Sequence, residues 1–300
     1  MARTSEATGD SVLRKDAELT YALQWLATSF PEVGKEIFSD SYIEKMSGGV
    51  SNESYRVVAG DYDWVVRLRK CNKASYLLDI EIETKLLKNA AEADLVPVVV
   101  KGDPVAGILV TQYLKGAKPW TQSLARQHRN IIRIASRLQE FHQIDMNLET
   151  YRPLDISQSY IDEAGSLCER DRAWGKELIT YAMNYERCYR PKVVCHNDLV
   201  AENILDDGTL RFIDLEYAVA ADPILDLASL VAMNDFEGDQ VSYLLYNYYG
   251  GESPCSTQSF FNIVRMTHLL SYFWCLSRIQ EVEDSSSFKL FAAKIAAMLR

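Results

Sequence analysis

Two acidic segments that lie close together in the sequence set the strongest constraint on how this chain folds. The first reads HNDLVAEN (residues 196–203) and the second reads FIDLEYA (residues 212–218). The two segments hold four carboxylates, one His and two Asn, and apolar runs flank them. Burying like charges side by side is costly unless a positive charge lies among them. The pattern therefore predicts that folding gathers these side chains around a divalent metal ion.

The composition is that of a folded globular protein. The chain has 300 residues, of which 48% are hydrophobic and 25% charged, enough for one large domain or two lobes. Its net charge of −10 argues against nucleic acid as a partner, because phosphate backbones attract basic surfaces. An acidic chain suits a cationic small molecule better.

The six cysteines form no C-x-x-C pair, so we expect free thiols and no zinc site. The N-terminus has no apolar leader, and no stretch is apolar enough to span a membrane, so we expect a cytoplasmic protein without membrane insertion. The first ten or so residues are small and polar, and we expect them to be disordered.

The first part of the chain is predicted to be rich in strands. A helical pattern stops at Pro31, and a second helix over residues 77–93 ends before Pro97. Short runs rich in Val, Ile, Tyr and Trp predict antiparallel strands joined by hairpins, at residues 42–46, 53–59, 63–69, 97–102 and 107–114.

The second part is predicted to be mostly helical. Apolar residues recur at helical spacing over residues 123–144, 156–171, 173–189, 224–233, 239–250 and 259–282. One β-like island interrupts them at residues 203–216, where Asp207-Gly208 is a strong hairpin turn signal. The chain is therefore predicted to be an α+β protein whose sheet-rich and helical parts join near residues 111–116, and such seams favour ligand sites.

The spacing of the acidic segments suits metal-dependent phosphoryl transfer. Asp198 and Asn203 lie five residues apart, and the hairpin returns the chain so that Asp214 ends its second strand. This chemistry needs one carboxylate to orient the accepting hydroxyl, and an Asn and a second carboxylate to hold Mg²⁺ against the phosphates. Protein kinases have the same Asp-to-Asn interval, followed by D-F-G where this chain has Asp214-Leu215-Glu216.

HNDLVAEN, IDLEYA and DPILDLASL (residues 222–230) resemble the choline/ethanolamine kinase and aminoglycoside phosphotransferase family, with bacterial choline kinases the nearest and thiamine kinases next. The resemblance covers roughly residues 40–300 and implies a bilobal protein-kinase-like fold. Its small antiparallel-sheet lobe, residues 1–113, would bind the nucleotide, and its larger helical lobe, residues 114–300, would hold the catalytic loop and the acceptor site. The implied activity is ATP- and Mg²⁺-dependent phosphorylation of a hydroxyl group on a small cationic molecule.

The resemblance also implies roles for particular residues. Asp198 would be the catalytic residue, Asn203 and Asp214 the Mg²⁺ ligands, and His196 a structural residue of the catalytic loop. Arg67 would neutralise phosphate charge and pair with Glu83, with Arg69 and Lys70 as rivals for Arg67 and Glu81 as the alternative to Glu83. The other expected ATP contacts are a glycine loop and a hinge segment, namely Gly48, Gly49, Ser51, Asn52, and Gln112 to Leu114.

The acceptor is harder to identify. Trp274 corresponds to the first aromatic of the family's W-x-x-W pair, but the second position is Ser277, and Leu225 stands where an aromatic is common. Glu216 and Asp226 are further candidate acceptor contacts, although Asp226 could instead brace its helix. Choline, ethanolamine, thiamine, an aminoglycoside or another amino alcohol all remain open, as does the choice between monomer and homodimer.

Two other classes of function compete with a kinase. A metal-dependent phosphohydrolase would use Asp198, Asp214, Glu216 and His196 as ligands, but it leaves the glycine loop and the strand cation unexplained. A catalytically inactive nucleotide-binding relative is disfavoured because Asp198, Asn203 and Asp214 are all present.

Overall fold

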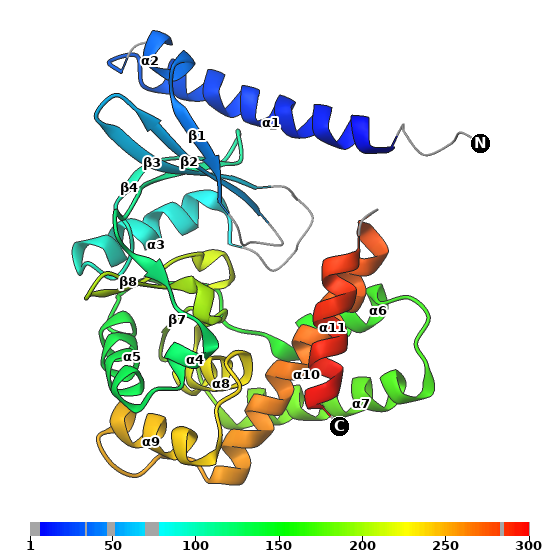
Figure 1. Cartoon of the computed structure of the whole chain (residues 1–300). Coiled ribbons are helices and arrows are strands. Elements are labelled where there is room, and N and C mark those ends of the chain that lie inside the picture. Colours follow the sequence, from blue (N-terminus) through cyan, green and yellow to red (C-terminus); the bar gives the residue numbers. More distant parts are fainter. Residues whose placement is uncertain (1–6, 34, 47–51, 70–77, 283–284, 300) are drawn as a thin grey trace. The chain divides into compact units, whose positions relative to one another are not determined.

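The chain forms two compact units (Figure 1). The computed structural model describes residues 7–33, 35–46, 52–69, 78–282 and 285–299. Unit 1 comprises Met1–Ala74, Asp79–Lys85 and Pro97–Lys115, and unit 2 comprises Ser75–Leu78, Leu86–Val96 and Gly116–Arg300. The single boundary predicted at residues 113 and 114 stays a prediction.

Unit 1 is built on a five-stranded antiparallel sheet with the strand order β1-β2-β3-β5-β4. Every strand predicted for this part of the sequence is present. The strands are β1 (Tyr42–Lys45), β2 (Asn52–Ala59), β3 (Tyr62–Arg69), β4 (Val99–Asp103) and β5 (Ile108–Gln112).

Alternation along β3 gives the sheet two different faces. Trp64, Val66 and Leu68 are buried on one face, in a core with residues of β2 and β5. Arg67 and Arg69 point to the other face, because successive side chains of a strand alternate. The strand therefore presents two cations opposite the hydrophobic core.

Helix α1 (Ala7–Ser29) packs on the apolar face of this sheet through Ala22 and Leu26. It begins at Ala7, ten residues before the apolar helical pattern starts at Ala17, so residues 7–10, expected to be disordered, are helical. Lengthening an existing helix needs no new nucleus, so an anchored helix can extend into a segment without an apolar pattern. The short helix α2 (Lys35–Ser39) follows, and α3 (Ile80–Glu92) lies where a helix was predicted.

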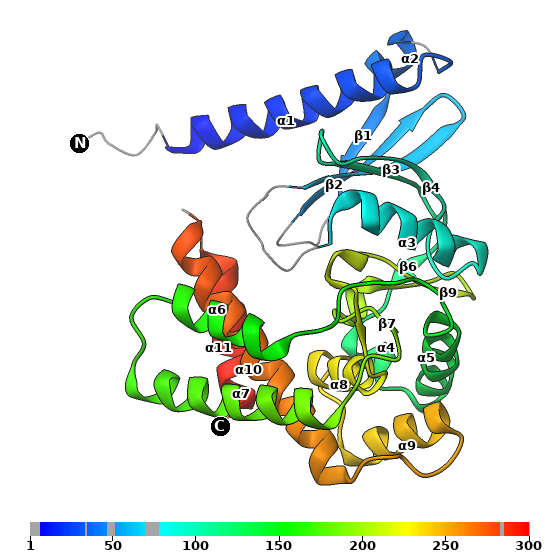
Figure 2. The same ribbon diagram turned by 180° about the vertical axis from the view of Figure 1, so that it is seen from behind.

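Unit 2 is mostly helical, as predicted (Figure 2). Helix α8 (Ile224–Met233) is buried on all sides, as expected for a helix that is hydrophobic all round. The long helix α10 (Thr257–Glu281) packs against α8, α6, α7 and α11. The other helices are α4 (Gln122–Ala125), α5 (His128–Phe141), α6 (Pro153–Glu163), α7 (Glu169–Cys188), α9 (Gly238–Tyr249) and α11 (Ser286–Met298).

Two small antiparallel strand pairs lie next to the two acidic segments in the chain. The predicted hairpin consists of β8 (Ile204–Asp206) and β9 (Leu210–Phe212), and Gly208 has φ 111° at its turn. The strand β6 (Lys118–Pro119) pairs with β8. A second ladder, which the sequence did not predict, pairs β7 (Val193–Cys195) with β10 (Val219–Ala221), so that one acidic segment follows β7 and the other precedes β10.

No helix among the described residues combines the length and apolar character needed to cross a membrane.

The buried stripe of α5 generates a stability prediction. Ile131 is fully buried, whereas its neighbour Ile132 is 44% exposed. Replacing Ile131 with Ala should lower the free energy of unfolding by about 2–5 kcal/mol, because it leaves a cavity. Ile132→Ala, the matched control, should change it by no more than about 0.5 kcal/mol. Urea unfolding followed by circular dichroism measures both, and equal losses would contradict the assigned burial.

Candidate active site

The 196–203 segment forms a loop, called the catalytic loop below, that begins where β7 ends. Asn197 has φ 64°, and Asp214 in the second acidic segment has φ 66°. Asn and Asp tolerate this left-handed conformation better than other residues with a Cβ atom. The sequence thus places residues able to adopt the required backbone at both sharp bends.

Asp226 in α8 anchors the start of the catalytic loop. Its carboxylate is fully buried and accepts backbone N–H groups from His196 (2.8 Å) and Asn197 (2.7 Å). Its Oδ2 also lies 3.1 Å from Nε2 of His142, whose Nδ1 is 2.6 Å from the hydroxyl of Tyr248. A buried carboxylate with these partners supports the bracing role for Asp226, and an acceptor contact by this residue stays a prediction.

His196 connects the two acidic segments. Its ring is fully buried, its Nε2 lies 3.0 Å from the carbonyl oxygen of Ile213, and its Nδ1 accepts the N–H of Asp198 at 3.3 Å. Burial lowers the pKa of His196, so the neutral ring with hydrogen on Nε2 satisfies both bonds. With both nitrogens occupied, His196 is a structural residue, and the phosphohydrolase hypothesis loses one of its ligands.

Two further residues of the α8 region hold the catalytic loop, and the sequence analysis missed both. The hydroxyl of Ser229 accepts the N–H of Leu199 at 3.2 Å, and the amide of Asn234 donates to the carbonyl of Leu199 at 2.8 Å. Ser229 follows Asp226 by three residues and so shares its helix face. Two polar residues at this spacing on an otherwise apolar helix are the sequence feature from which the role of Ser229 could have been predicted.

Asp198 and Asn203 are in direct contact. Nδ2 of Asn203 donates to Oδ2 of Asp198 at 2.9 Å and to its backbone carbonyl at 3.0 Å. The carbonyl of Asn203 in turn accepts the N–H of Ile213 at 3.0 Å, which continues the β8–β9 ladder. The hairpin therefore brings residue 203 opposite residue 213, next to Asp214.

The charges of Asp198 and Asp214 repel each other. The pKa of Asp198 is raised to about 7, first because burial disfavours its charged form and then because Asp214 carries a like charge, while the hydrogen bond from Asn203 opposes the shift. The three residues predicted to work together are thus gathered in unit 2.

These residues fit a hard divalent cation. Because Nδ2 of Asn203 is committed to Asp198, its Oδ1 faces elsewhere and can serve as a ligand beside the Asp214 carboxylate. Amide and carboxylate oxygens are the ligands that Mg²⁺ prefers. A cation there would also relieve the repulsion between the two carboxylates.

Another pair fixes the hairpin that carries Asn203. Arg133 of α5 holds Asp206 with two hydrogen bonds of 2.7 Å, and the indole N–H of Trp120 donates to the same carboxylate at 2.9 Å. The Arg133 guanidinium keeps the pKa of Asp206 well below its usual range. The sequence analysis did not identify this pair, because only the fold brings residues 133 and 206 together.

In unit 1, both predicted strand cations contact the same glutamate. Oε2 of the buried Glu83 lies 2.5 Å from Nη2 of Arg67 and 3.1 Å from Nη2 of Arg69. Glu81 instead forms an exposed ion pair with Lys85. Glu83 is thus the helix residue that faces the strand cations, and Arg67 and Arg69 share it.

The structure describes only some of the expected nucleotide contacts. Gly48, Gly49, Ser51 and Lys70 fall outside the described residues. Asn52 is buried at the start of β2. In the hinge, the backbone N–H of Gln112 donates to the carbonyl oxygen of Val98. Leu114 is half-buried.

The expected acceptor residues are buried or half-buried. Trp274 is half-buried and its ring packs edge-on against Phe288 of α11, with 5.4 Å between the ring centroids. Ser277 is fully buried and donates to the carbonyl of Trp274, and Leu225 is 1% exposed within α8. Glu216 is also 1% exposed. An acceptor contact by Trp274 or Glu216 stays a prediction.

A second group with the chemistry of metal ligands lies beneath the catalytic loop. Ligand atoms of His142, Cys195 and Asp226 lie within 4.8 Å of one another, and all three residues are buried. Burial raises the pKa of the Cys195 thiol, which keeps it protonated, and Asp226 already accepts backbone donors. We therefore interpret this cluster as a hydrogen-bonded brace.

The raised pKa of Asp198 predicts how stability depends on pH without metal. Because the folded-state pKa of about 7 exceeds the ordinary value of 3.8, the native state retains this proton between those values. This contribution to stability is complete below about pH 4 and is lost as the pH rises through about 7. Asp198→Asn carries no charge and still accepts the Asn203 hydrogen bond, so its stability relative to the wild type should increase from pH 4 to pH 8.

Urea unfolding in EDTA across that pH range measures the difference. Asp145→Asn, which changes an exposed carboxylate of unit 2, is the control. A gap between Asp198→Asn and the wild type that stays constant with pH would contradict the assigned pKa.

Comparison with known proteins finds relatives in sequence and in fold. Protein LicA of Haemophilus influenzae is 26% identical over 214 residues, which cover 67% of this chain and 61% of LicA, so the chain spans about three fifths of that relative's length. Choline kinase LicA from Streptococcus pneumoniae superposes with a TM-score of 0.76 at 18% identity, covering 92% of this chain and 98% of that one. A structure of LicA in complex with AMP gives a TM-score of 0.73 at 19% identity, covering 92% and 97%.

These structural likenesses confirm the predicted protein-kinase-like fold. The family model described as "Phosphotransferase enzyme family" matches residues 43–254. This range includes both acidic segments and, apart from Tyr42, the whole sheet of unit 1. The chain therefore belongs to the phosphotransferase enzyme family, the family that its acidic motifs predicted.

Proposed function

We propose that this protein is a small-molecule kinase that transfers the terminal phosphoryl group of ATP to a hydroxyl group of a small cationic alcohol. The observation that carries the proposal is the contact of Asp198 with Asn203 and its electrostatic coupling to Asp214. The family assignment and the likeness to choline kinase LicA support it.

Asp198 would orient the acceptor. Its carboxylate accepts a hydrogen bond from the acceptor hydroxyl and aims the oxygen at the terminal phosphorus of ATP. As the new P–O bond forms, the bond from that phosphorus to the bridging oxygen breaks, ADP leaves, and Asp198 receives the hydroxyl proton. A pKa near 7 suits a group that exchanges a proton at neutral pH.

Asn203 and Asp214 would hold the metal. Bound Mg²⁺ would neutralise phosphate charge and orient the terminal phosphoryl group. The contribution of the chain is to fix its ligands: the hydrogen bond to Asp198 sets the direction of the Asn203 amide, and the left-handed backbone at residue 214 sets that of the carboxylate.

Arg67 would supply a positive charge to the nucleotide phosphates. Glu83 holds it at 2.5 Å, and Arg69 offers a second charge on the same strand face. A guanidinium that is already oriented loses little conformational entropy on binding a phosphate. AMP in the similar LicA structure supports a nucleotide site in this fold.

A cationic alcohol is the acceptor class that we favour. The chain carries a net charge of −10, and LicA from Streptococcus pneumoniae, which has the same fold, is a choline kinase. Ser277 and Leu225 replace two aromatics that a quaternary ammonium cage would use, so an acceptor with a smaller ammonium group, such as ethanolamine, is as well supported as choline.

An acceptor screen tests the function. The wild-type protein with ATP and Mg²⁺ should release ADP only when an alcohol from a panel of choline, ethanolamine, thiamine and an aminoglycoside is added. Asp198→Ala should reduce turnover of the best acceptor by about 10²- to 10⁴-fold with little change in ATP affinity, because it removes the group that orients the hydroxyl.

The exposed neighbour Glu202→Ala is the matched control and should retain activity. Phosphate release from esters without ATP would favour a hydrolase, and ATP binding without turnover on any acceptor would favour an inactive relative. Asp198→Ala with wild-type turnover would exclude the assigned role.

The metal ligand assignment predicts a separate effect. Asp214→Asn removes one charged oxygen donor, so the Mg²⁺ concentration for half-maximal activity should rise by about tenfold or more. Asp207→Asn, in the turn of the neighbouring hairpin, leaves the ligands in place and should behave like the wild type. Titration of activity with Mg²⁺ measures both, and an unchanged midpoint for Asp214→Asn would show that another group holds the metal.

A further inference from the structure

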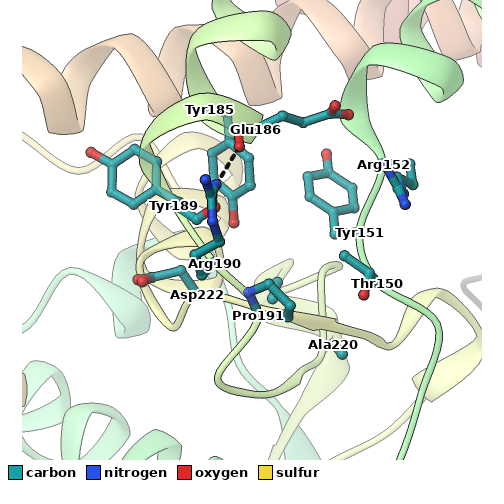
Figure 3. A pocket seen from close by; sticks show the side chains of 11 residues that line it. Thr150, Tyr151, Arg152, Tyr185, Glu186, Tyr189, Arg190, Pro191, Ala220 and Asp222 are labelled. Atoms are coloured by element: carbon teal, nitrogen blue, oxygen red, sulfur yellow. Dashed lines mark hydrogen bonds between the residues drawn. The ribbon is translucent and has the colours of Figure 1, made fainter.

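A cavity of about 190 Å³ in unit 2 lies between the end of α7, the segment before α6, and β10 (Figure 3). Its buried hydroxyl, Oη of Tyr185, faces the backbone of Asp222. Arg152 and Arg190 lie on opposite sides of the tyrosine rings, so their charges do not meet at one point. This cavity therefore indicates no particular ligand, whereas the sheet of unit 1 carries a charged group with a defined geometry.

The face of that sheet opposite its hydrophobic core carries a third arginine. Arg56 of β2 lies on this face, because its neighbours Tyr55 and Val57 are both buried in the core and successive side chains alternate. Arg67 and Arg69 of β3 lie on the same face. The face expected to meet the nucleotide phosphates therefore extends to Arg56.

Arg56 lies nearer the hinge than Arg67 does. Helix α3 contacts this face through Glu83, which binds Arg67 and Arg69. In the register of the sheet, Arg67 is opposite Leu109, whereas Arg56 lies in the row of residue 111, just before the hinge. Arg56 reaches one row further, to Asp63, which is four residues or about 13 Å of strand from Arg67. That span is comparable to the distance between the base and the terminal phosphate of an extended nucleotide.

Two contacts hold the Arg56 guanidinium in a fixed plane. Its Nε and Nη2 donate to the two carboxylate oxygens of Asp63 at 2.9 and 2.7 Å. Its Cζ lies 3.9 Å from the centre of the Tyr113 ring, which covers one face of the group. Among the described residues, no other ring lies against the guanidinium and its Nη1 has no hydrogen-bond partner. The second face is therefore available to a ligand.

Tyr113 is itself fixed by the sheet. Its N–H donates to the carbonyl oxygen of Asp63 at 2.9 Å, which continues the pairing of β3 with β5 into the hinge. Asp63 thus holds Arg56 through its side chain and Tyr113 through its backbone. The stacked pair is preorganised beside the segment expected to meet the adenine edge.

A guanidinium held in this way suits the flat face of a nucleotide base. The group is planar and weakly hydrated and stacks on aromatic rings, and arginine adds a cation–π attraction to bases. Because Asp63 balances the charge of Arg56, the pair offers a phosphate little net attraction. Stacking is the interaction that this geometry favours, and a purine presents a larger ring surface for it than a pyrimidine.

We propose that Arg56 stacks on the base of the bound nucleotide and favours purines over pyrimidines. The guanidinium lies between the Tyr113 ring and the base, and Asp63 keeps its plane parallel to both. The inference rests on the ATP dependence of the proposed function, and it gives Arg56 a role separate from that of Arg67, which would contact phosphate.

Isothermal titration calorimetry on the full chain with Mg²⁺ separates the base contact from the phosphate contact. The ligands are ADP, CDP and inorganic tripolyphosphate, and the wild type should bind ADP more tightly than CDP. Arg56→Leu should weaken ADP binding about tenfold, as expected for the loss of one base stack, weaken CDP binding less, and leave tripolyphosphate binding unchanged. Arg67→Leu should weaken the binding of all three.

Further variants separate the plane of Arg56 from its charge. Arg56→Lys keeps the charge but has no plane, so it should bind ADP as weakly as Arg56→Leu. Tyr113→Leu removes the ring that supports the guanidinium and should weaken ADP binding several-fold. Lys85→Leu, which removes a cation from an exposed ion pair on α3, is the control and should leave all three affinities unchanged.

Three results would overturn the inference and leave the proposed kinase function in place. They are wild-type ADP affinity in Arg56→Leu, wild-type ADP affinity in Arg56→Lys, and equal losses of ADP and tripolyphosphate binding in both Arg56 variants. A wild-type chain that binds neither ADP nor ATP would overturn the inference and the proposed function together. Retained tripolyphosphate binding by a variant also shows that its phosphate site is folded.

Discussion

A buried carboxylate, Asp226, holds the backbone on which the rest of the candidate active site depends. Its two oxygens accept N–H groups from successive residues at the start of the catalytic loop, where Asn197 takes a left-handed conformation. Hydrogen bonds to a charged acceptor contribute on the order of 1.5–3 kcal/mol each, enough to hold such a bend. His142 and Tyr248 extend the network on its other side, so two distant helices fix one turn of the chain.

Side-chain hydrogen bonds also connect the other segments of the site. His196 joins the catalytic loop to the strand that leads to Asp214, and Asn203 joins Asp198 to the hairpin. His196 uses both ring nitrogens, and the Nδ2 of Asn203 makes two hydrogen bonds to Asp198. The side chains expected to act on phosphate are thus positioned by neighbours that touch neither nucleotide nor acceptor, an arrangement that preorganised catalysis requires.

The sequence predicted the sheet of unit 1 and most helices of unit 2 because those elements are long enough to show a periodic pattern. It did not predict β6, β7 or β10, since two or three residues cannot display alternation. The Asp198–Asn203 contact was predictable from local spacing. The bracing role of Asp226 was left open because burial depends on the surrounding fold, and the pairing of Arg133 with Asp206 is set by residues far apart in the chain.

The short strand β10 joins two parts of unit 2. One edge pairs with β7, which leads into the catalytic loop, and at the other edge Ala220 bonds with Glu149 and Tyr151, in the segment before α6. A strand of three residues cannot separate from one partner and keep the other in register. Local unfolding of β10 is therefore a single cooperative event, and the catalytic loop and the segment before α6 share one limit of thermal tolerance.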